Sequence, residues 1–148
     1  MDIHSKEVRS YNMSCIKGKN SKPEVLVRKY LFSKGFRYRI NYKKLIGHPD
    51  IVLPKYRTAI FINGCFWHAH EGCPKFVFPK SNTEFWETKF LQNRLRDENQ
   101  YNQLKNSGWQ VIVIWTCQLT KDKFQLTMDA IINEILSKPY ASRYSNFS

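Results

Sequence analysis

Hydrophobic and polar residues form distinct blocks along the chain, and their spacing predicts a mixed α/β domain. The Ser-Lys-Pro-Glu start at 21–24, followed by apolar residues at helical spacing, predicts a helix from about Pro23 to Gly35. Apolar residues alternate with charged or polar ones over 36–41, which indicates a half-buried strand with a cationic outer face. Residues 50–53 and 58–62 are short apolar runs and predict a hairpin.

The second half of the chain predicts two more helices around another strand. A long helix is expected over Thr83–Asn106, with Gly108 after its end, and the continuously apolar run 111–114 is typical of a central strand. Thr120 then caps a last helix with six core residues at helical spacing: Phe124, Met128, Ile131, Ile132, Ile135 and Leu136. We therefore expect a small mixed sheet flanked by helices.

Length and hydropathy indicate one domain over residues 1–148. The chain has 148 residues and is 42% hydrophobic, which allows one sizeable core but leaves little room for two. The polar opening and the tail 139–148 are expected to be poorly packed. The chain contains no run of about 18 apolar residues and begins without the apolar core of a signal peptide, so we expect a cytoplasmic protein with no membrane partner.

Charge narrows the class of partner. The net charge is +12, and residues 1–50 alone hold 12 basic and 4 acidic side chains. Such an uneven positive field attracts polyanions, and nucleic acid is the commonest of these. The alternative is a basic surface that binds nothing.

The stretch 64–73 combines cysteine, histidine and large aromatic residues. Cys65, His70 and Cys73 have the spacing C-x4-H-x2-C, and Cys117, just after the apolar strand, can supply a fourth ligand. A closed Cys3His set leaves no open coordination position, so it predicts a structural zinc ion. Two alternatives stay open: the four cysteines of the chain could form two disulfides, or Cys117 could be only a buried apolar residue.

Three further residues are candidates for phosphodiester hydrolysis. Asp50 opens a strand in a basic protein and could hold Mg²⁺, although the next strand lacks the acidic residue and lysine that many nucleases place there. His68 lies in the zinc loop but outside the ligand set, and Asp97 on the long helix could orient it. Asp50 could instead cap a turn, and His68 could simply be hydrogen-bonded in place.

Eight blocks of sequence, in order from about residue 2 to residue 120, resemble the very short patch repair (Vsr) DNA mismatch endonucleases. Any one of these blocks is weak evidence, but their shared order is highly specific. The blocks are Arg9–Met13, Gly18–Glu24, Gly47–Pro54, Gly64–His68, Glu84–Trp86, Asn93–Asp97, Gly108–Trp109 and Val113–Cys117.

The resemblance implies a restriction-endonuclease-like core and a monomeric bacterial enzyme. The family nicks one strand of duplex DNA 5′ of the thymine in a T:G mismatch left by deamination of 5-methylcytosine, with mismatch-repair proteins as candidate partners. By position, Asp50 corresponds to the Mg²⁺ ligand, with the backbone carbonyl of Ile62, while Glu24 supports the metal through water. His68 and Asp97 correspond to the catalytic histidine and its orienting carboxylate. The Cys3His set corresponds to the family's structural zinc ligands.

The resemblance also assigns DNA contacts. Phe66, Trp67 and Trp86 correspond to residues that wedge into the base stack beside the mismatch, a step whose unstacking cost is lower where pairing is imperfect. The alternative is that all three rings belong to the core. Three lysines are expected to contact DNA from a flexible arm over residues 1–22: Lys17, Lys19 and Lys22.

Asn63 departs from the family pattern, which places a histidine just before the Gly-Cys-Phe-Trp-His block. Asparagine can orient a water molecule or donate to a phosphate oxygen, but it cannot accept a proton at neutral pH. We expect activity to be retained because Asp50, His68 and Asp97 are all present. The alternative is a zinc-stabilised protein that binds mismatched or duplex DNA with little or no cleavage.

Overall fold

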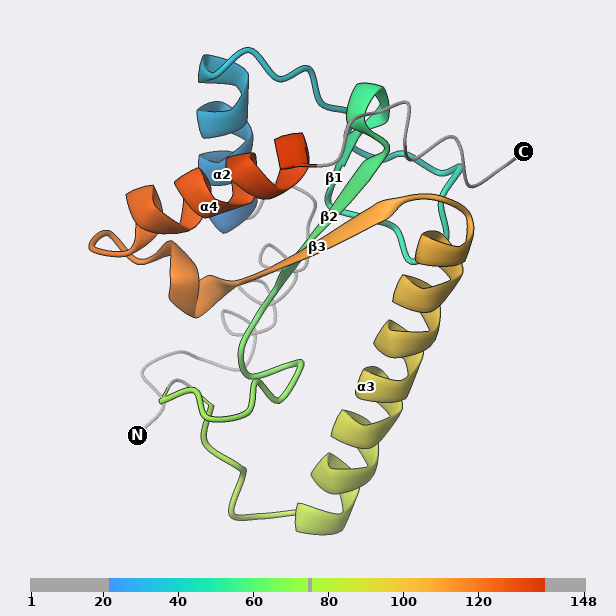
Figure 1. The fold of residues 1–148 in the computed structure, drawn as a ribbon. Helices are drawn as coiled ribbons and strands as arrows, with labels where there is room; N and C mark the ends of the chain where they lie inside the picture. Colours follow the sequence, from blue (N-terminus) through green and yellow to red (C-terminus); the bar gives the residue numbers. More distant parts are fainter. Residues whose placement is uncertain (1–21, 75, 138–148) are drawn as a thin grey trace.

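The computed structural model describes residues 22–74 and 76–137, which form a small sheet between helices (Figure 1). Helix α2 (Lys22–Ser33) is followed by strand β1 (Ile51–Leu53), a 3-10 turn (Pro54–Tyr56) and strand β2 (Thr58–Asn63). Helix α3 (Thr83–Asn106) then leads to strand β3 (Gln110–Trp115), a second 3-10 turn (Thr116–Leu119) and helix α4 (Phe124–Ser137). The hairpin and the bounds of the long helix agree with the sequence prediction.

The sheet has the order β1-β2-β3 and is mixed, as predicted. Strands β1 and β2 are antiparallel, with Ile51 opposite Ile60, whereas β2 and β3 run parallel from the pair Thr58–Gln110 to the pair Asn63–Trp115. The parallel pair needs a crossover connection, and α3 provides it.

Alternation along the strands produces a hydrophobic core on each face of the sheet. Ile60 and Ile114 point to one face, where they pack with Leu31 of α2 and Met128 of α4. On the other face Phe61 packs with Leu104 of α3. Figure 1 shows the same layers, with α2 and α4 on one side of the sheet and α3 on the other.

Two strand predictions were wrong in part. Residues 36–41 do not form a strand: Arg39 makes a single antiparallel bridge with Val52, although Phe36 is buried and Arg37 exposed as the alternation indicated. The run 111–114 lies in β3, which is at the edge of the described sheet, so the central strand is β2. The run is apolar because helices cover both faces of β3. Covering both faces does not require both edges of the strand to be hydrogen-bonded to other strands.

The last helix begins later than predicted. Thr120 accepts a hydrogen bond from the amide of Phe124 at 2.8 Å, and a turn separates it from the first helical residue. Met128, Ile131 and Ile135 are buried as expected, but Leu136 is 54% exposed and does not belong to the core. Among the described residues, every helix is too short or too polar to cross a membrane.

Candidate metal and catalytic sites

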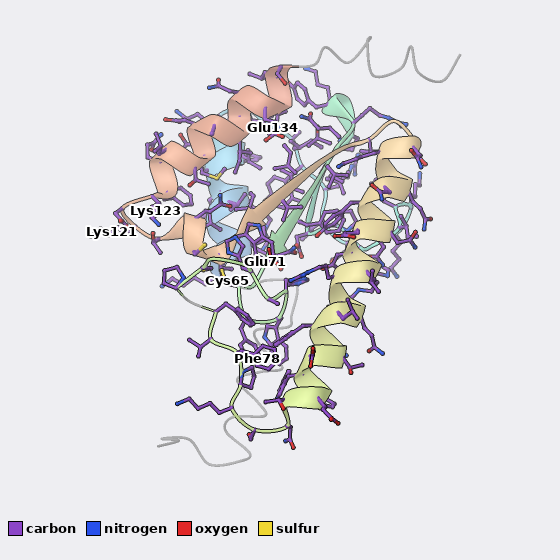
Figure 2. The ribbon with its side chains drawn as sticks, turned by 60° about the horizontal axis from the view of Figure 1, so that its bottom comes forward. Cys65, Glu71, Phe78, Lys121, Lys123 and Glu134 are labelled. Carbon is purple, nitrogen blue, oxygen red and sulfur yellow. The ribbon has the colours of Figure 1, made fainter. Side chains whose placement is uncertain are left out.

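The four predicted zinc ligands meet at one end of the sheet. Because β2 and β3 are parallel and end at the pair Asn63–Trp115, Cys65 and Cys117 each follow two residues after the last pair. The loop after β2 then turns back, with the amide of His70 donating to the carbonyl of Cys65 at 2.9 Å. Figure 2 shows Cys65 at the sheet end from which this loop departs.

The geometry and chemistry of this Cys3His cluster suit zinc. The ligand atoms of Cys65, His70, Cys73 and Cys117 all lie within 4.8 Å of one another. His70 Nδ1 lies 3.5 Å from Cys117 Sγ, close to the roughly 3.6 Å expected between a nitrogen and a sulfur on one tetrahedral zinc ion. The three cysteines are free thiols, which removes the disulfide alternative for these residues. Cys15 lies outside the described residues.

The thiols also have unequal acidity. Burial opposes ionisation of Cys65, but hydrogen bonds with Thr116, Cys117 and His70 outweigh it and lower the pKa of this thiol to about 6. Burial and the neighbouring sulfurs raise the pKa of Cys117 to about 11. Cys65 is therefore the more acidic of these two thiols, and a divalent cation at the centre of the cluster would favour the ionised form of Cys117 at neutral pH.

Trp115 packs against this cluster. Its indole stacks on the ring of His70, with centroids 4.0 Å apart and planes 2° from parallel. The side chain is only partly buried and fixes the orientation of a metal-ligand ring from the end of β3.

His68 and Asp97 are in direct contact. Asp97 Oδ2 lies 2.6 Å from His68 Nδ1, and the two side chains are 15% and 22% exposed. A carboxylate at this distance favours a proton on Nδ1, so Nε2 is the ring nitrogen left to move a proton. Helix α3 also holds the loop through Asn93, whose side chain donates to the carbonyl of Trp67 at 3.1 Å.

Asp50 lies where β1 begins, beside β2. The amide of Ile62 donates to Asp50 Oδ2 at 2.7 Å. In a strand the N–H and C=O of one residue point to the same edge, so the Ile62 carbonyl also faces the Asp50 side. Burial raises the pKa of Asp50, while the Ile62 amide, a hydrogen bond with Glu24 and the charge of His68 act in the opposite direction. Glu24 comes from α2 and is buried.

These oxygen donors suit a hard cation such as Mg²⁺, which prefers carboxylate and carbonyl ligands. The raised pKa of Asp50 indicates a carboxylate whose negative charge is incompletely balanced, and a bound cation would balance it. Asp50, Ile62, His68 and Asp97 line one open cleft of about 340 Å³. The structure therefore brings these four residues together from the start of β1, from β2, from the loop and from α3.

Asn63 and Tyr101 complete the floor of this cleft. Asn63 is 6% exposed, and its Nδ2 donates to the hydroxyl of Tyr101 at 3.0 Å. The sequence analysis did not identify Tyr101. The available signal was its position four residues after Asp97, which places both side chains on the same face of α3.

The predicted wedge residues form one aromatic cluster outside the sheet. Phe66 contacts Trp67 edge-on at 5.2 Å between centroids and Trp86 at 5.4 Å. Phe90 of α3 lies behind them, 5.5 Å from Phe66, and is 5% exposed. Phe66, Trp67 and Trp86 are all partly buried, so their rings support one another while part of each reaches the surface. In Figure 2, Phe78 lies farther along the same loop, beside α3.

The predicted DNA-contacting arm is mostly outside the described residues, including Lys17 and Lys19. Lys22 is the first residue of α2 and is exposed. The predictions for the tail 139–148 also lie outside the described residues.

Comparison with known proteins identifies the family. The family model described as "DNA mismatch endonuclease Vsr" matches residues 1–75. A "Type II nicking enzyme V.NmeAIP" from Neisseria meningitidis is 52% identical over 118 residues, which cover 80% of this chain and 84% of the relative. This chain belongs to the Vsr family. The "DNA mismatch endonuclease Vsr" of Escherichia coli is 36% identical over 134 residues, covering 90% of this chain and 85% of the relative.

A further Vsr relative, "Type II nicking enzyme V.XorIIP" from Xanthomonas oryzae, is 44% identical over 119 residues, covering 80% of this chain and 87% of the relative. Family membership confirms the predicted endonuclease class and the predicted restriction-endonuclease-like core. In this structure that core is the mixed sheet between helices.

Proposed function

We propose that this Vsr-family protein is a Mg²⁺-dependent endonuclease that nicks one strand of duplex DNA 5′ to the thymine of a T:G mismatch. The nick would initiate very short patch repair of deaminated 5-methylcytosine. The observation that carries the proposal is the shared cleft of Asp50, His68 and Asp97 beside the partly exposed rings of Phe66 and Trp67.

Asp50 and the Ile62 carbonyl would hold the magnesium ion, with Glu24 supporting Asp50 from α2. When bound, the ion supplies positive charge that offsets the negative charge developing on the scissile phosphate. His68 Nε2 would accept the proton of the attacking water, while Asp97 holds the ring in the required tautomer. The phosphorus–oxygen bond to the leaving sugar would break as the bond to the water oxygen forms.

Mismatch selection would come from the aromatic cluster. Stacking of a base on an aromatic side chain is worth about 1–3 kcal/mol, which is comparable with the unstacking cost of a few kcal/mol per base step. A T:G pair opens more cheaply than a Watson–Crick pair, so wedging by Phe66, Trp67 and Trp86 would favour it. The loop can keep these rings and His68 in a fixed relation if zinc holds Cys65, His70 and Cys73 together.

The deciding experiment is incubation of the full chain, with zinc bound, with an end-labelled T:G duplex and its T:A control in the presence of Mg²⁺. We expect one nick, in the thymine strand of the T:G duplex only. Equal cleavage of both duplexes would contradict the mismatch specificity, and cleavage without Mg²⁺ would contradict the metal assignment.

Asn63 motivates the second candidate, a mismatch-binding protein with little cleavage, because its amide cannot accept a proton. Intact T:G binding without a nick would favour this candidate. Asn63→His would then restore cleavage if the missing proton acceptor is the cause, and a variant that still does not cut would place the defect elsewhere.

A further inference from the structure

Tyr101 lines the cleft, and the function proposed above gives it no part. It lies on α3 one turn after Asp97, and its ring packs against Phe61 at 4.9 Å between centroids. It lines both the cleft that holds Asp50 and the adjoining cavity of about 550 Å³ that holds His68 and Asp97. A tyrosine needed only for the core could pack equally well as phenylalanine.

The hydroxyl of Tyr101 is oriented by a buried partner. Asn63 Nδ2 donates to it at 3.0 Å, so the hydroxyl oxygen acts as an acceptor there and its own proton must be directed to another group. Burial raises the pKa of Tyr101 and the negative charges of Asp97 and Asp50 add to this effect, which outweighs the opposing effects of the Asn63 hydrogen bond and the charge of Arg96. The group therefore remains a neutral hydrogen-bond donor at neutral pH.

A neutral donor suits this position. Arg96 Nη2 already pairs with Asp97 Oδ1 at 3.2 Å, and His68 occupies Oδ2, so a lysine or arginine at position 101 would compete for a carboxylate whose two oxygens both have partners. A hydroxyl leaves the 2.6 Å contact between His68 and Asp97 intact and can still donate to an anionic oxygen entering the cleft. In the proposed reaction, the scissile phosphate lies between Asp50 and His68. The anionic oxygen nearest to the Tyr101 hydroxyl would therefore be an oxygen of that phosphate.

We propose that Tyr101 donates a hydrogen bond to a non-bridging oxygen of the scissile phosphate, with Asn63 fixing the direction of its hydroxyl. This inference rests on the proposed function and adds a catalytic residue to it. Because the negative charge on that oxygen grows as the water attacks, the hydrogen bond would be stronger in the transition state than in the bound substrate.

The test is Tyr101→Phe, which keeps the ring and its packing on Phe61. With the T:G duplex and Mg²⁺, we expect the single-turnover nicking rate to fall about 100-fold, as for loss of one oxyanion donor, while duplex affinity stays within about twofold. Tyr30→Phe is the matched control, because the Tyr30 hydroxyl makes hydrogen bonds with Asp129 and Gln125 away from the cleft. Its nicking rate should equal that of the wild type.

A second readout uses duplexes with sulfur in place of one or the other non-bridging oxygen at the cleavage point. Sulfur is a poorer acceptor, so one of the two diastereomers should lose the contact with Tyr101. In Tyr101→Phe the rate penalty for that diastereomer should be smaller by about 2- to 10-fold, less than the loss of the whole bond because sulfur still accepts weakly, and the penalty for the other diastereomer should be unchanged.

The outcomes separate the two proposals. A wild-type enzyme that nicks T:G, combined with an unaffected Tyr101→Phe rate, overturns the role of Tyr101 and leaves the proposed function standing. Lost duplex affinity with an unchanged single-turnover rate, or equal sulfur penalties in both proteins, overturns it as well. A wild-type chain that binds T:G and never nicks it overturns both proposals.

Discussion

Replacing Asp97 with asparagine tests the proposed catalytic pair of His68 and Asp97 without changing the shape of the cleft. The contact between His68 Nδ1 and Asp97 Oδ2 is 2.6 Å long and its partners are only 22% and 15% exposed, so solvent screens it weakly. A hydrogen bond to a charged group contributes about 1.5–3 kcal/mol. At 1.36 kcal/mol per factor of ten, its loss in the transition state lowers the rate by about 10- to 150-fold.

The assay is single-turnover nicking of a T:G duplex with enzyme in excess, together with equilibrium binding of the same duplex. Asp97→Asn should lower the rate and leave the affinity equal or slightly higher, because a negative charge near the phosphates is removed. Glu98→Gln removes the same charge from the next residue of α3, which is exposed, and controls for the change in field. An Asp97→Asn rate within about twofold of the Glu98→Gln rate would refute the reasoning. Even the weakest hydrogen bond in the range above corresponds to a rate loss of about tenfold.

Three further changes test the metal sites and the wedge. Cys73→Ala should abolish zinc binding and nicking while the far-ultraviolet circular dichroism of the helices persists, because two apolar cores do not depend on the loop; one zinc per chain in this variant by metal analysis would contradict the ligand set. Asp50→Asn should abolish nicking yet raise the melting temperature in Mg²⁺-free buffer at pH 7, because the raised pKa of Asp50 means that ionising it in the folded state costs free energy. The gain should grow as pH rises from the ordinary value of 3.8 and vanish below it, so a gain that persists at pH 3 would argue against this cause. Trp67→Ala should reduce the preference for T:G over T:A binding by about 1–3 kcal/mol, measured by titration of both duplexes, and an equal loss on both would indicate a general contact.

The spacing of apolar residues predicted much of the fold, because it indicates which faces of a helix or strand are buried. Proline, glycine and apolar spacing located α2, the hairpin and both ends of α3. Alternation over 36–41 correctly indicated the burial of Phe36, but burial does not determine pairing, and only Arg39 of this segment pairs with the sheet. Leu136 has helical spacing with the core and is exposed, because it lies in the last turn of α4 on a side that the sheet does not cover.

The site was predictable where residue type limits the chemistry. Cysteine and histidine spacing predicted four ligands that the structure brings together. Asn63 and Tyr101 could not be paired from sequence, because they lie 38 residues apart and the helix around Tyr101 is polar on both sides. The stacking of Trp115 on His70 could not be predicted either, since nothing in a strand-end tryptophan indicates that its ring will stack on a predicted metal ligand.

The position of Cys117 just after a parallel strand has a consequence for how the molecule folds. The final ligand is separated from Cys65 by the whole crossover through α3, so it cannot reach the others until β3 has docked beside β2. Closing so large a segment of chain is slow and entropically costly, and it precedes any benefit from the metal. We expect zinc to bind tightly only late in folding. The ion would then stabilise the sheet after its strands have paired and would not nucleate their pairing.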